Sequence, residues 1–241
     1  MPARAISHRR RHERRHDEAM TPLKYDPSIT AVVMIDPQND VLSPTGKSWD
    51  AVQDSVVENG TVEHLVAVCS AAKTGEFPVF VSPHYFYPTD HDWLFNGPLE
   101  SDELHDNTFA RSGALSLDGF AGSGADWLDR LRPFIEDPTT VVASPHKVWG
   151  PQTNDLVLQL RKRAITNVIL CGMLANMCVE SHLRDLLEQG FQVTVVRDAT
   201  AGPRHPTRGD GYQAALVNYA FLAHEVVYTK EVVAAMKSPR R

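Results

Sequence analysis

Strand and helix patterns alternate along this chain, and that alternation restricts the possible folds more than any other feature. The apolar run 30–35 is typical of a buried strand, and residues 56–72 after it have helical spacing. Repeated units of this kind form a mostly parallel sheet with helices on both faces. We therefore expect a single-domain, doubly wound, three-layer α/β/α sandwich with a six-stranded, mostly parallel sheet. The other strands are expected at 78–81, 140–143, 167–171, 191–196 and 225–228.

The helices between these strands have recognisable ends. Thr153 is expected to cap a helix that runs through Leu160, because a threonine hydroxyl can accept a bond from a free backbone N–H. Gly190 is expected to end the helix that follows Cys178. A further helix is expected over 212–222.

Composition is that of an ordinary soluble protein. The 241 residues carry a net charge of −6 and are 42% hydrophobic, which suits one large core and argues against a nucleic-acid binder. The cysteines, Cys69, Cys171 and Cys178, have neither disulfide nor zinc-site spacing, so we expect a reducing, cytoplasmic location. No apolar stretch approaches the roughly 18 residues that span a bilayer, so no membrane partner is expected.

Two segments differ from the rest of the chain. Residues 1–21 are expected to be a disordered basic tail before a domain at 22–237; a tether for an anionic surface and a true start at Met20 are alternatives. Residues 84–139 separate the second and third strands and are rich in aromatic side chains. Loops of this length are commonly functional, so we expect a lid, with a packed decoration or an oligomer contact as alternatives.

Cys178 occupies a position that suits a nucleophile. It lies shortly after the strand 167–171, and a helical pattern begins directly after it. Ligand crevices of open α/β folds lie at the carboxyl ends of strands, and a helix amino terminus stabilises a thiolate over a thiol. The alternative is a buried core cysteine.

Asp36 and Lys147 fall at corresponding places on two other strands. Asp36 ends the first strand and Lys147 follows the third, so we expect both side chains to meet Cys178 at one edge of the sheet. A carboxylate there can accept the thiol proton, and an ammonium can stabilise the thiolate. The alternatives are a helix cap for Asp36 and a surface charge for Lys147.

The chain resembles the cysteine hydrolases of the isochorismatase-like superfamily, in the amidohydrolase branch that includes ureido and carbamoyl amidohydrolases. The resemblance runs from about residue 22 to residue 236. The matching segments are IDPQNDV at 35–41, PHK at 145–147, GMLANMCVES at 172–181 and VRDATA at 196–201.

The resemblance implies an active site and its parts. These are a catalytic triad of Asp36, Lys147 and Cys178 and a cis peptide between Met173 and Leu174. The backbone N–H groups of Leu174 and Cys178 would form an oxyanion hole, which stabilises the negative charge that develops on a carbonyl oxygen under attack.

The sequence departs from the family's pattern in two places. The threonine often found three residues before the cysteine is replaced by Ala175. The Asp-x-His of the nicotinamidases' metal site is replaced by Ser-Pro-His at 82–84. Because His84 and His91 without a carboxylate make a poor metal site, we expect no metal and no cofactor, and His84 as a pocket or packing residue.

Several other side chains are weaker candidates for contact with a substrate. Trp149 could form a pocket wall or pack in the core, and Gln213 could donate to a substrate carbonyl or simply be solvated. Arg111 and Arg204 match the shape of a carboxylate, although surface positions are the alternative. The full set of expected substrate-binding residues is Gln38, His84, Trp149, Arg111 and Gln213.

These features predict a cysteine-dependent, metal-independent amidohydrolase that cleaves a C–N bond of a small amide, carbamoyl or ureido compound through an acyl-enzyme on Cys178. The alternatives are an isochorismatase-type vinyl ether hydrolase with Asp36 as the acid, and a non-catalytic binding protein on the same scaffold. From the habit of the family we expect a homodimer or homotetramer.

Overall fold

The computed structural model describes residues 25–237, and a sheet of six parallel strands lies at its centre. The strand order changes direction between β1 and β4, and such a switch point is where α/β folds bind ligands. In spatial order the strands are β3 (Val141–Val142), β2 (Val79–Ser82), β1 (Thr30–Ile35), β4 (Asn167–Met173), β5 (Gln192–Ala201) and β8 (Glu225–Val227).

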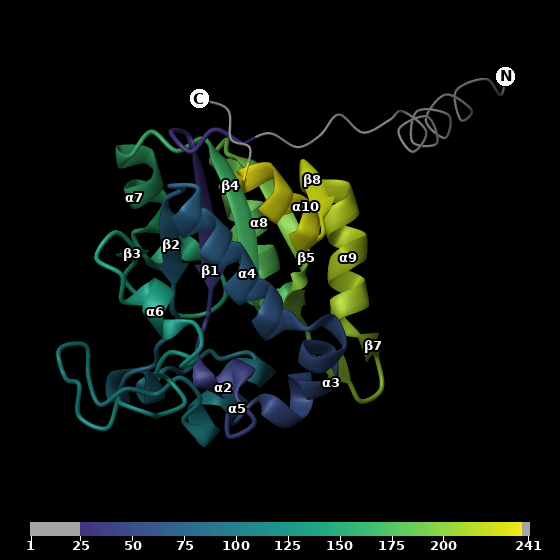
Figure 1. Cartoon of the computed structure of the whole chain (residues 1–241). Coiled ribbons are helices and arrows are strands. Elements are labelled where there is room, and N and C mark those ends of the chain that lie inside the picture. Colours follow the sequence, from purple (N-terminus) through teal and green to yellow (C-terminus); the bar gives the residue numbers. More distant parts are fainter. Residues whose placement is uncertain (1–24, 238–241) are drawn as a thin grey trace, which may run out of the picture.

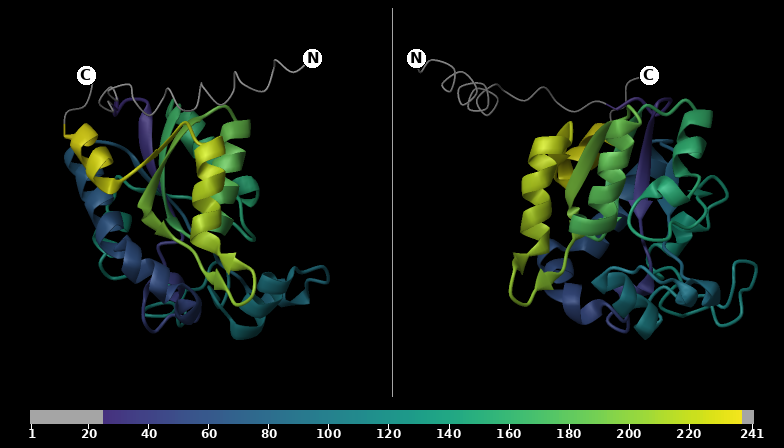
Figure 2. Two further views of the ribbon diagram at one scale, coloured as in Figure 1. Left: turned by 90° about the vertical axis from the view of Figure 1, so that its right-hand side faces the viewer. Right: turned by 180° about the vertical axis from the view of Figure 1, so that it is seen from behind.

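Helices cover both faces of this sheet (Figures 1 and 2). Alternate side chains of a strand point to opposite faces, so Met34 belongs to one apolar core and Ile35 to the other. The first core is covered by α3 (Trp49–Asn59), α4 (Thr61–Thr74) and α10 (Thr229–Met236). The second is covered by α7 (Leu156–Lys162), α8 (Glu180–Glu188) and α9 (Gly211–Leu222). The expected three-layer α/β/α sandwich is confirmed.

All six expected strands are present, but two helical expectations need correction. The single helix expected over 56–72 is divided at Gly60, whose φ of 59° is a left-handed conformation that glycine adopts readily. Thr153 does not cap α7, because Asp155 precedes that helix and the Thr153 hydroxyl accepts the N–H of Lys147 at 3.0 Å. The helix α10 was not expected.

The segment 84–139 lies at the end of the molecule where β1 finishes (Figure 1). Isolated bridges join it to neighbouring segments, from His84 to His146 and from Trp127 to Gln38. It is therefore packed onto the domain, and its role as a lid stays a prediction. Its short helices are η1 (Pro88–Asp92), α5 (Pro98–Asp106) and α6 (Arg132–Ile135), and α2 (Asn39–Leu42) follows β1 nearby.

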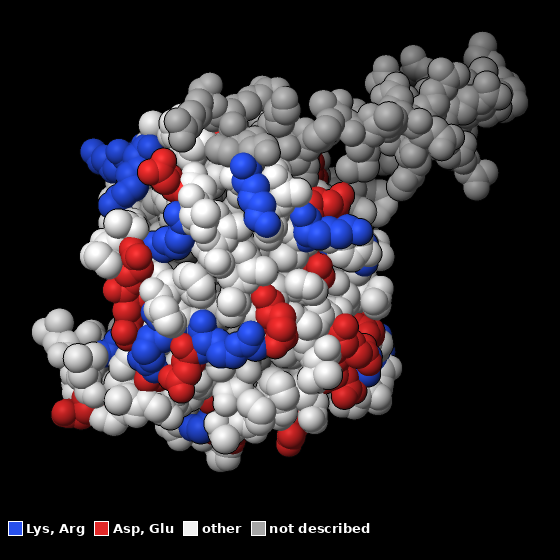
Figure 3. All heavy atoms as spheres, viewed as in Figure 1, with Lys and Arg blue, Asp and Glu red and all other residues white. Residues whose placement is uncertain are grey.

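Charged side chains of both signs are spread over one face of the described part of the molecule. On the side drawn in Figure 3, basic and acidic side chains are intermixed. Between residues 25 and 237, no helix combines the length and apolarity needed to cross a bilayer. The basic tail expected at 1–21 lies outside the described residues.

Gly172 stands where β4 runs closest to the end of β1. Its φ is 111°, and a Cβ at this position would overlap the backbone carbonyl oxygen of Ile35. Gly190 also has a positive φ, of 83°, but open space surrounds it. A substitution at Gly172 would therefore meet both backbone strain and steric overlap, whereas one at Gly190 would meet backbone strain alone.

We expect Gly172→Ala to lower the free energy of unfolding by about 3 kcal/mol or more, because strain and overlap with backbone act together. The control Gly190→Ala should cost only about 1 kcal/mol, since strain acts there alone. Urea denaturation followed by circular dichroism measures both. If both variants lost the same free energy of unfolding, steric overlap between β4 and the backbone of Ile35 would be excluded as a cause.

Candidate active site

Asp36 is the first residue after β1, and its carboxyl group is buried at the switch point of the sheet. Its φ of 47° is a left-handed conformation that aspartate tolerates better than most residues. The N–H of Asp36 donates to the carbonyl of Ser82 at 3.1 Å. Burial raises the pKa of Asp36 to about 6, so the carboxyl can gain or lose a proton near neutral pH.

Cys178 lies in η3 (Ala175–Val179), the turn between β4 and α8, and only 3% of its surface is exposed. Its sulfur lies within 4.8 Å of an Asp36 carboxylate oxygen, and the thiol donates to the carbonyl of Val148 at 4.0 Å. The backbone N–H of Leu174 slightly lowers the pKa of Cys178, and the peptide between Met173 and Leu174 is cis, as expected. The predicted nucleophile, base and one oxyanion donor are thus together.

The thiol of Cys178 holds its proton more tightly than an ordinary cysteine. Burial raises the pKa of Cys178 well above its usual value, and the negative charge of Asp36 raises that pKa further. The expectation that a helix amino terminus favours the thiolate is therefore wrong for the resting protein. A nucleophilic attack from Cys178 needs a base to remove the proton.

Lys147 does not lie beside Asp36 and Cys178 as expected. Its Nζ donates to Asp90 Oδ2 at 2.5 Å and to the carbonyl of Tyr85 at 3.1 Å. The same ammonium lies 3.7 Å from the centroid of the Tyr87 ring. All these partners belong to the 84–139 segment, so Lys147 ties that segment to the residues after β3.

His146 takes the place that was expected for Lys147. Successive residues of an extended segment point to opposite sides, so a lysine that faces outward leaves the preceding side chain facing inward. The buried His146 ring donates from Nε2 to Asp36 Oδ1 at 2.8 Å. Burial lowers the pKa of His146 to about 3, so the imidazole is a neutral donor.

His182 is a second histidine that the sequence reasoning missed. It lies four residues after Cys178, a helical spacing that places both on one side of the chain and was the available signal. Its Nδ1 donates to the Cys178 carbonyl at 2.7 Å, and Nε2 accepts from the Ser82 hydroxyl at 2.9 Å. Since burial lowers the pKa of His182 to about 3, this ring positions the turn of the nucleophile without adding charge.

His84 lies in the same cluster as a packing residue, one of the two roles expected for it. Its ring stacks on Phe109 with centroids 4.9 Å apart, and Nε2 donates to the carbonyl of Lys147 at 2.9 Å. Burial lowers the pKa of His84 to about 3, so this ring is neutral as well. The expected contact of His84 with a substrate stays a prediction.

The cluster also has the chemistry of a metal site. Asp36, His84, His146 and Cys178 each offer a ligand atom, and these atoms lie within 4.8 Å of one another. A mixed nitrogen, oxygen and sulfur set is the type that binds zinc. A cation held there would occupy the sulfur and the carboxylate. The expected absence of a metal and of any cofactor stays a prediction.

Gln38 has a structural role in place of the expected contact with a substrate. Its Oε1 accepts the N–H of His84 at 2.9 Å, and Nε2 donates to the carbonyls of His84 and Ala125. These bonds hold the start of the 84–139 segment and its later part at Ala125 against the end of β1. The side-chain amide is therefore already occupied.

Other candidates lie at the surface. Gln213 is exposed on α9, and His91 is exposed in η1. The exposed guanidinium of Arg204 forms ion pairs with Asp54, Glu58 and Asp210, which leaves it committed to this acidic cluster. These three side chains therefore lie at the surface, outside the buried cluster of Asp36 and Cys178.

The positions of Arg111 and Trp149 are compatible with the contact to a substrate that was expected for them. The guanidinium of Arg111 lies between the rings of Tyr85 and Phe120, 4.8 and 4.7 Å from their centroids. Trp149 is half-buried and lines a groove of about 420 Å³ between the residues after β3 and the outer side of α8. Val148 also lines this groove, and its carbonyl oxygen lies 4.0 Å from the Cys178 sulfur. One wall of the groove is therefore close to the nucleophile.

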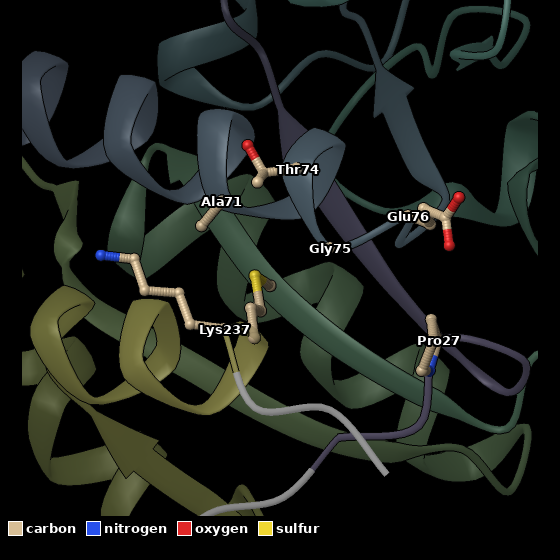
Figure 4. A pocket seen from close by; sticks show the side chains of 7 residues that line it. Pro27, Ala71, Thr74, Gly75, Glu76 and Lys237 are labelled. Carbon is tan, nitrogen blue, oxygen red and sulfur yellow. The ribbon is translucent and has the colours of Figure 1, made fainter. Parts of the chain in front are cut away.

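A second hollow, of about 260 Å³, lies at the other end of the sheet (Figure 4). It precedes β1 and β2, whereas Asp36 and Cys178 follow β1 and β4, so it is separate from the buried cluster. Its lining residues are Pro27, Ala71, Thr74, Gly75, Glu76, Met236 and Lys237.

The family model described as Isochorismatase domain matches residues 30–231. The chain belongs to the isochorismatase family. It is 29% identical over 205 residues to the ureidoacrylate amidohydrolase RutB of Pseudomonas savastanoi pv. phaseolicola, which covers 82% of this chain and 79% of that protein. The RutB of Methylobacterium radiotolerans is 27% identical, with 82% and 75% covered.

Solved structures of the isochorismatase family share the fold. A cysteine hydrolase from Pseudomonas syringae pv. phaseolicola superposes with a TM-score of 0.74 at 22% identity, over 92% of this chain and 99% of that one. N-carbamoylsarcosine amidase from Thermoplasma acidophilum superposes with a TM-score of 0.61 at 19% identity, over 83% and 96%. The resemblance inferred from the motifs is confirmed.

We expect His146→Ala to raise the pKa of Asp36 by about one unit or more, because a hydrogen bond to the charged carboxylate is lost. The neighbouring Lys147→Ala should leave this pKa nearly unchanged, since that ammonium faces Asp90. Carbon-13 NMR titration of the aspartate carboxyl groups measures both. A larger shift in Lys147→Ala than in His146→Ala would restore Lys147 to the triad.

Proposed function

We propose that this protein is a cysteine-dependent amidohydrolase that cleaves a C–N bond of a small amide, carbamoyl or ureido compound through an acyl-enzyme on Cys178. The observation that carries the proposal is the proximity of the protonated Cys178 thiol to Asp36, whose carboxyl oxygen lies within 4.8 Å of the sulfur and has a pKa of about 6. The names of the RutB and carbamoylsarcosine amidase relatives support the class, a hydrolase of C–N bonds other than peptide bonds.

The reaction begins with transfer of the thiol proton. The ionised Asp36 accepts the proton from Cys178, and the sulfur attacks the carbonyl carbon of the substrate. The carbonyl oxygen becomes an oxyanion, for which the N–H groups of Leu174 and Cys178 are the proposed donors. The effect of the Leu174 N–H on the pKa of Cys178 supports its assignment as one of these donors.

Collapse of the tetrahedral intermediate breaks the C–N bond. Asp36, now protonated, gives its proton to the leaving nitrogen, which departs as ammonia or an amine. A thioester joins the acyl group to Cys178. Asp36 then takes a proton from water, the hydroxide attacks the thioester, and the acid leaves as the thiol regains its proton.

His146 orients Asp36 at the place where the sequence predicted Lys147 as a stabiliser of the thiolate. Its Nε2–H fixes one oxygen of Asp36, so the carboxylate keeps one orientation through both proton transfers. Because His146 is neutral, Asp36 keeps a pKa near neutrality, which suits a group that must both accept and release a proton.

The proposed partner is a small-molecule amide or ureido compound that approaches along the Trp149 groove, with Arg111 as a further candidate contact. The homodimer or homotetramer, the cytoplasmic location and the absence of nucleic-acid partners are part of the same proposal.

Cys178→Ala should reduce ammonia release from an accepted amide by roughly 10⁴-fold or more, because no other group can form the acyl-enzyme. Cys69→Ala is the control, since Cys69 lies on α4 in the apolar core on the opposite face of the sheet from Cys178. A screen of primary amides, carbamoyl compounds and ureido acids identifies the substrate. Full activity in Cys178→Ala that is lost in Asp36→Asn would favour vinyl ether hydrolysis instead.

The acid limb of the pH profile should report Asp36. The carboxyl acts as a base only when ionised and its pKa is about 6, so activity rises with pH through this value. Below it, kcat/KM should fall about tenfold per pH unit, measured over pH 4 to 8 with the same amide. An activity that stays constant down to pH 4 would exclude Asp36 as the base.

A further inference from the structure

Glu103 is a buried carboxyl group that the proposed hydrolysis does not use. It lies on α5 with 6% of its surface exposed, and within residues 25–237 its Oε2 has no hydrogen-bond partner. A buried polar atom without a partner is unfavourable, and a bound ligand can supply the missing partner. Burial raises the pKa of Glu103 to about 8.

Contacts at the end of α5 place this helix beside the catalytic cluster. The N–H of Thr108 donates to the Glu103 carbonyl at 2.8 Å, and the next residue, Phe109, stacks on His84. The thiol of Cys178 has its pKa raised by burial, by Asp36 and, more weakly, by the charge of Glu103. Glu103 and the nucleophile therefore share one environment.

Several carboxylates lie near Glu103. After burial, the charges of Asp36, Glu100, Asp40 and Asp102 raise its pKa. Lys147, the cation expected here, is paired with Asp90.

We propose that Glu103 is a specificity-determining residue that binds a positively charged nitrogen of the substrate, so that amides carrying an ammonium group are preferred to neutral or anionic ones. This inference rests on the proposed amidohydrolase function. An ammonium has three N–H donors and one positive charge, so it supplies both the missing partner of Oε2 and the missing counter-charge. Its arrival favours ionisation of the Glu103 carboxyl, because an opposite charge stabilises the carboxylate.

The test compares amides that have the same shape and differ in charge. Glycinamide, β-alaninamide and 4-aminobutanamide are matched with propanamide, butanamide and pentanamide, and succinamate is the anionic member. For the full chain at pH 7.5, at least one ammonium amide should exceed its neutral match in kcat/KM by about tenfold, the effect of one charge-assisted bond.

Glu103→Gln keeps the size and hydrogen-bonding capacity of the side chain and removes the charge. It should reduce kcat/KM for the preferred ammonium amide about tenfold and change the neutral match less than about threefold. The control is Asp102→Asn, an exposed carboxylate one residue earlier on α5, which should keep the preference. No preference in the natural protein, or a preference that survives Glu103→Gln, overturns the proposal.

A second measurement needs no turnover and so separates this inference from the proposed function. At pH 9, with Glu103 ionised, Cys178 is modified with a trimethylammonium-ethyl or a sulfonatoethyl methanethiosulfonate and followed by peptide mass spectrometry. The ratio of the cationic to the anionic rate should fall at least about threefold in Glu103→Gln and stay constant in Asp102→Asn. An unchanged ratio in Glu103→Gln overturns the inference whether or not any amide is hydrolysed.

Discussion

The buried hydrogen bond from His146 to Asp36 is the interaction on which the rest of the site depends. It joins the residues after β3 to the end of β1, and its donor is a neutral imidazole. A cation at this place would hold the pKa of Asp36 low, because an opposite charge favours the carboxylate. A neutral donor orients the carboxylate and leaves its pKa near 6, so that Asp36 can both accept and release a proton.

The protonation of the Cys178 thiol is consistent with the neutral donors around it. With a carboxyl and neutral rings around it, the Cys178 thiol holds its proton in the resting protein. His182 fixes the carbonyl of Cys178 and is itself held by Ser82, whose hydroxyl accepts from Asn154 at 2.8 Å. The donors around the nucleophile are therefore neutral, and the proposed recognition of a cation would add the first positive charge to this cluster.

The 84–139 segment contributes as much to the site as the sheet does. Gln38 holds His84 and Ala125 of this segment against the end of β1, and the ion pair of Lys147 with Asp90 joins it to the residues after β3. Phe109 packs on the His84 ring and so joins the end of α5 to the histidines of the cluster. The family motif at the end of β5 is structural in a similar way, because Asp198 accepts from the N–H and the hydroxyl of Thr229 at the start of α10.

The sequence by itself determined the sheet, the family and the positions of Asp36 and Cys178. Apolar runs specify buried parallel strands, and right-handed connections bring the carboxyl ends of those strands to one edge. Only the tertiary structure decided between His146 and Lys147, because β3 has two residues and is too short for a pattern that shows which side chain faces inward. The partner of Lys147, Asp90, lies 57 residues away, and the protonation of Cys178 depends on burial, which neighbouring residues do not reveal.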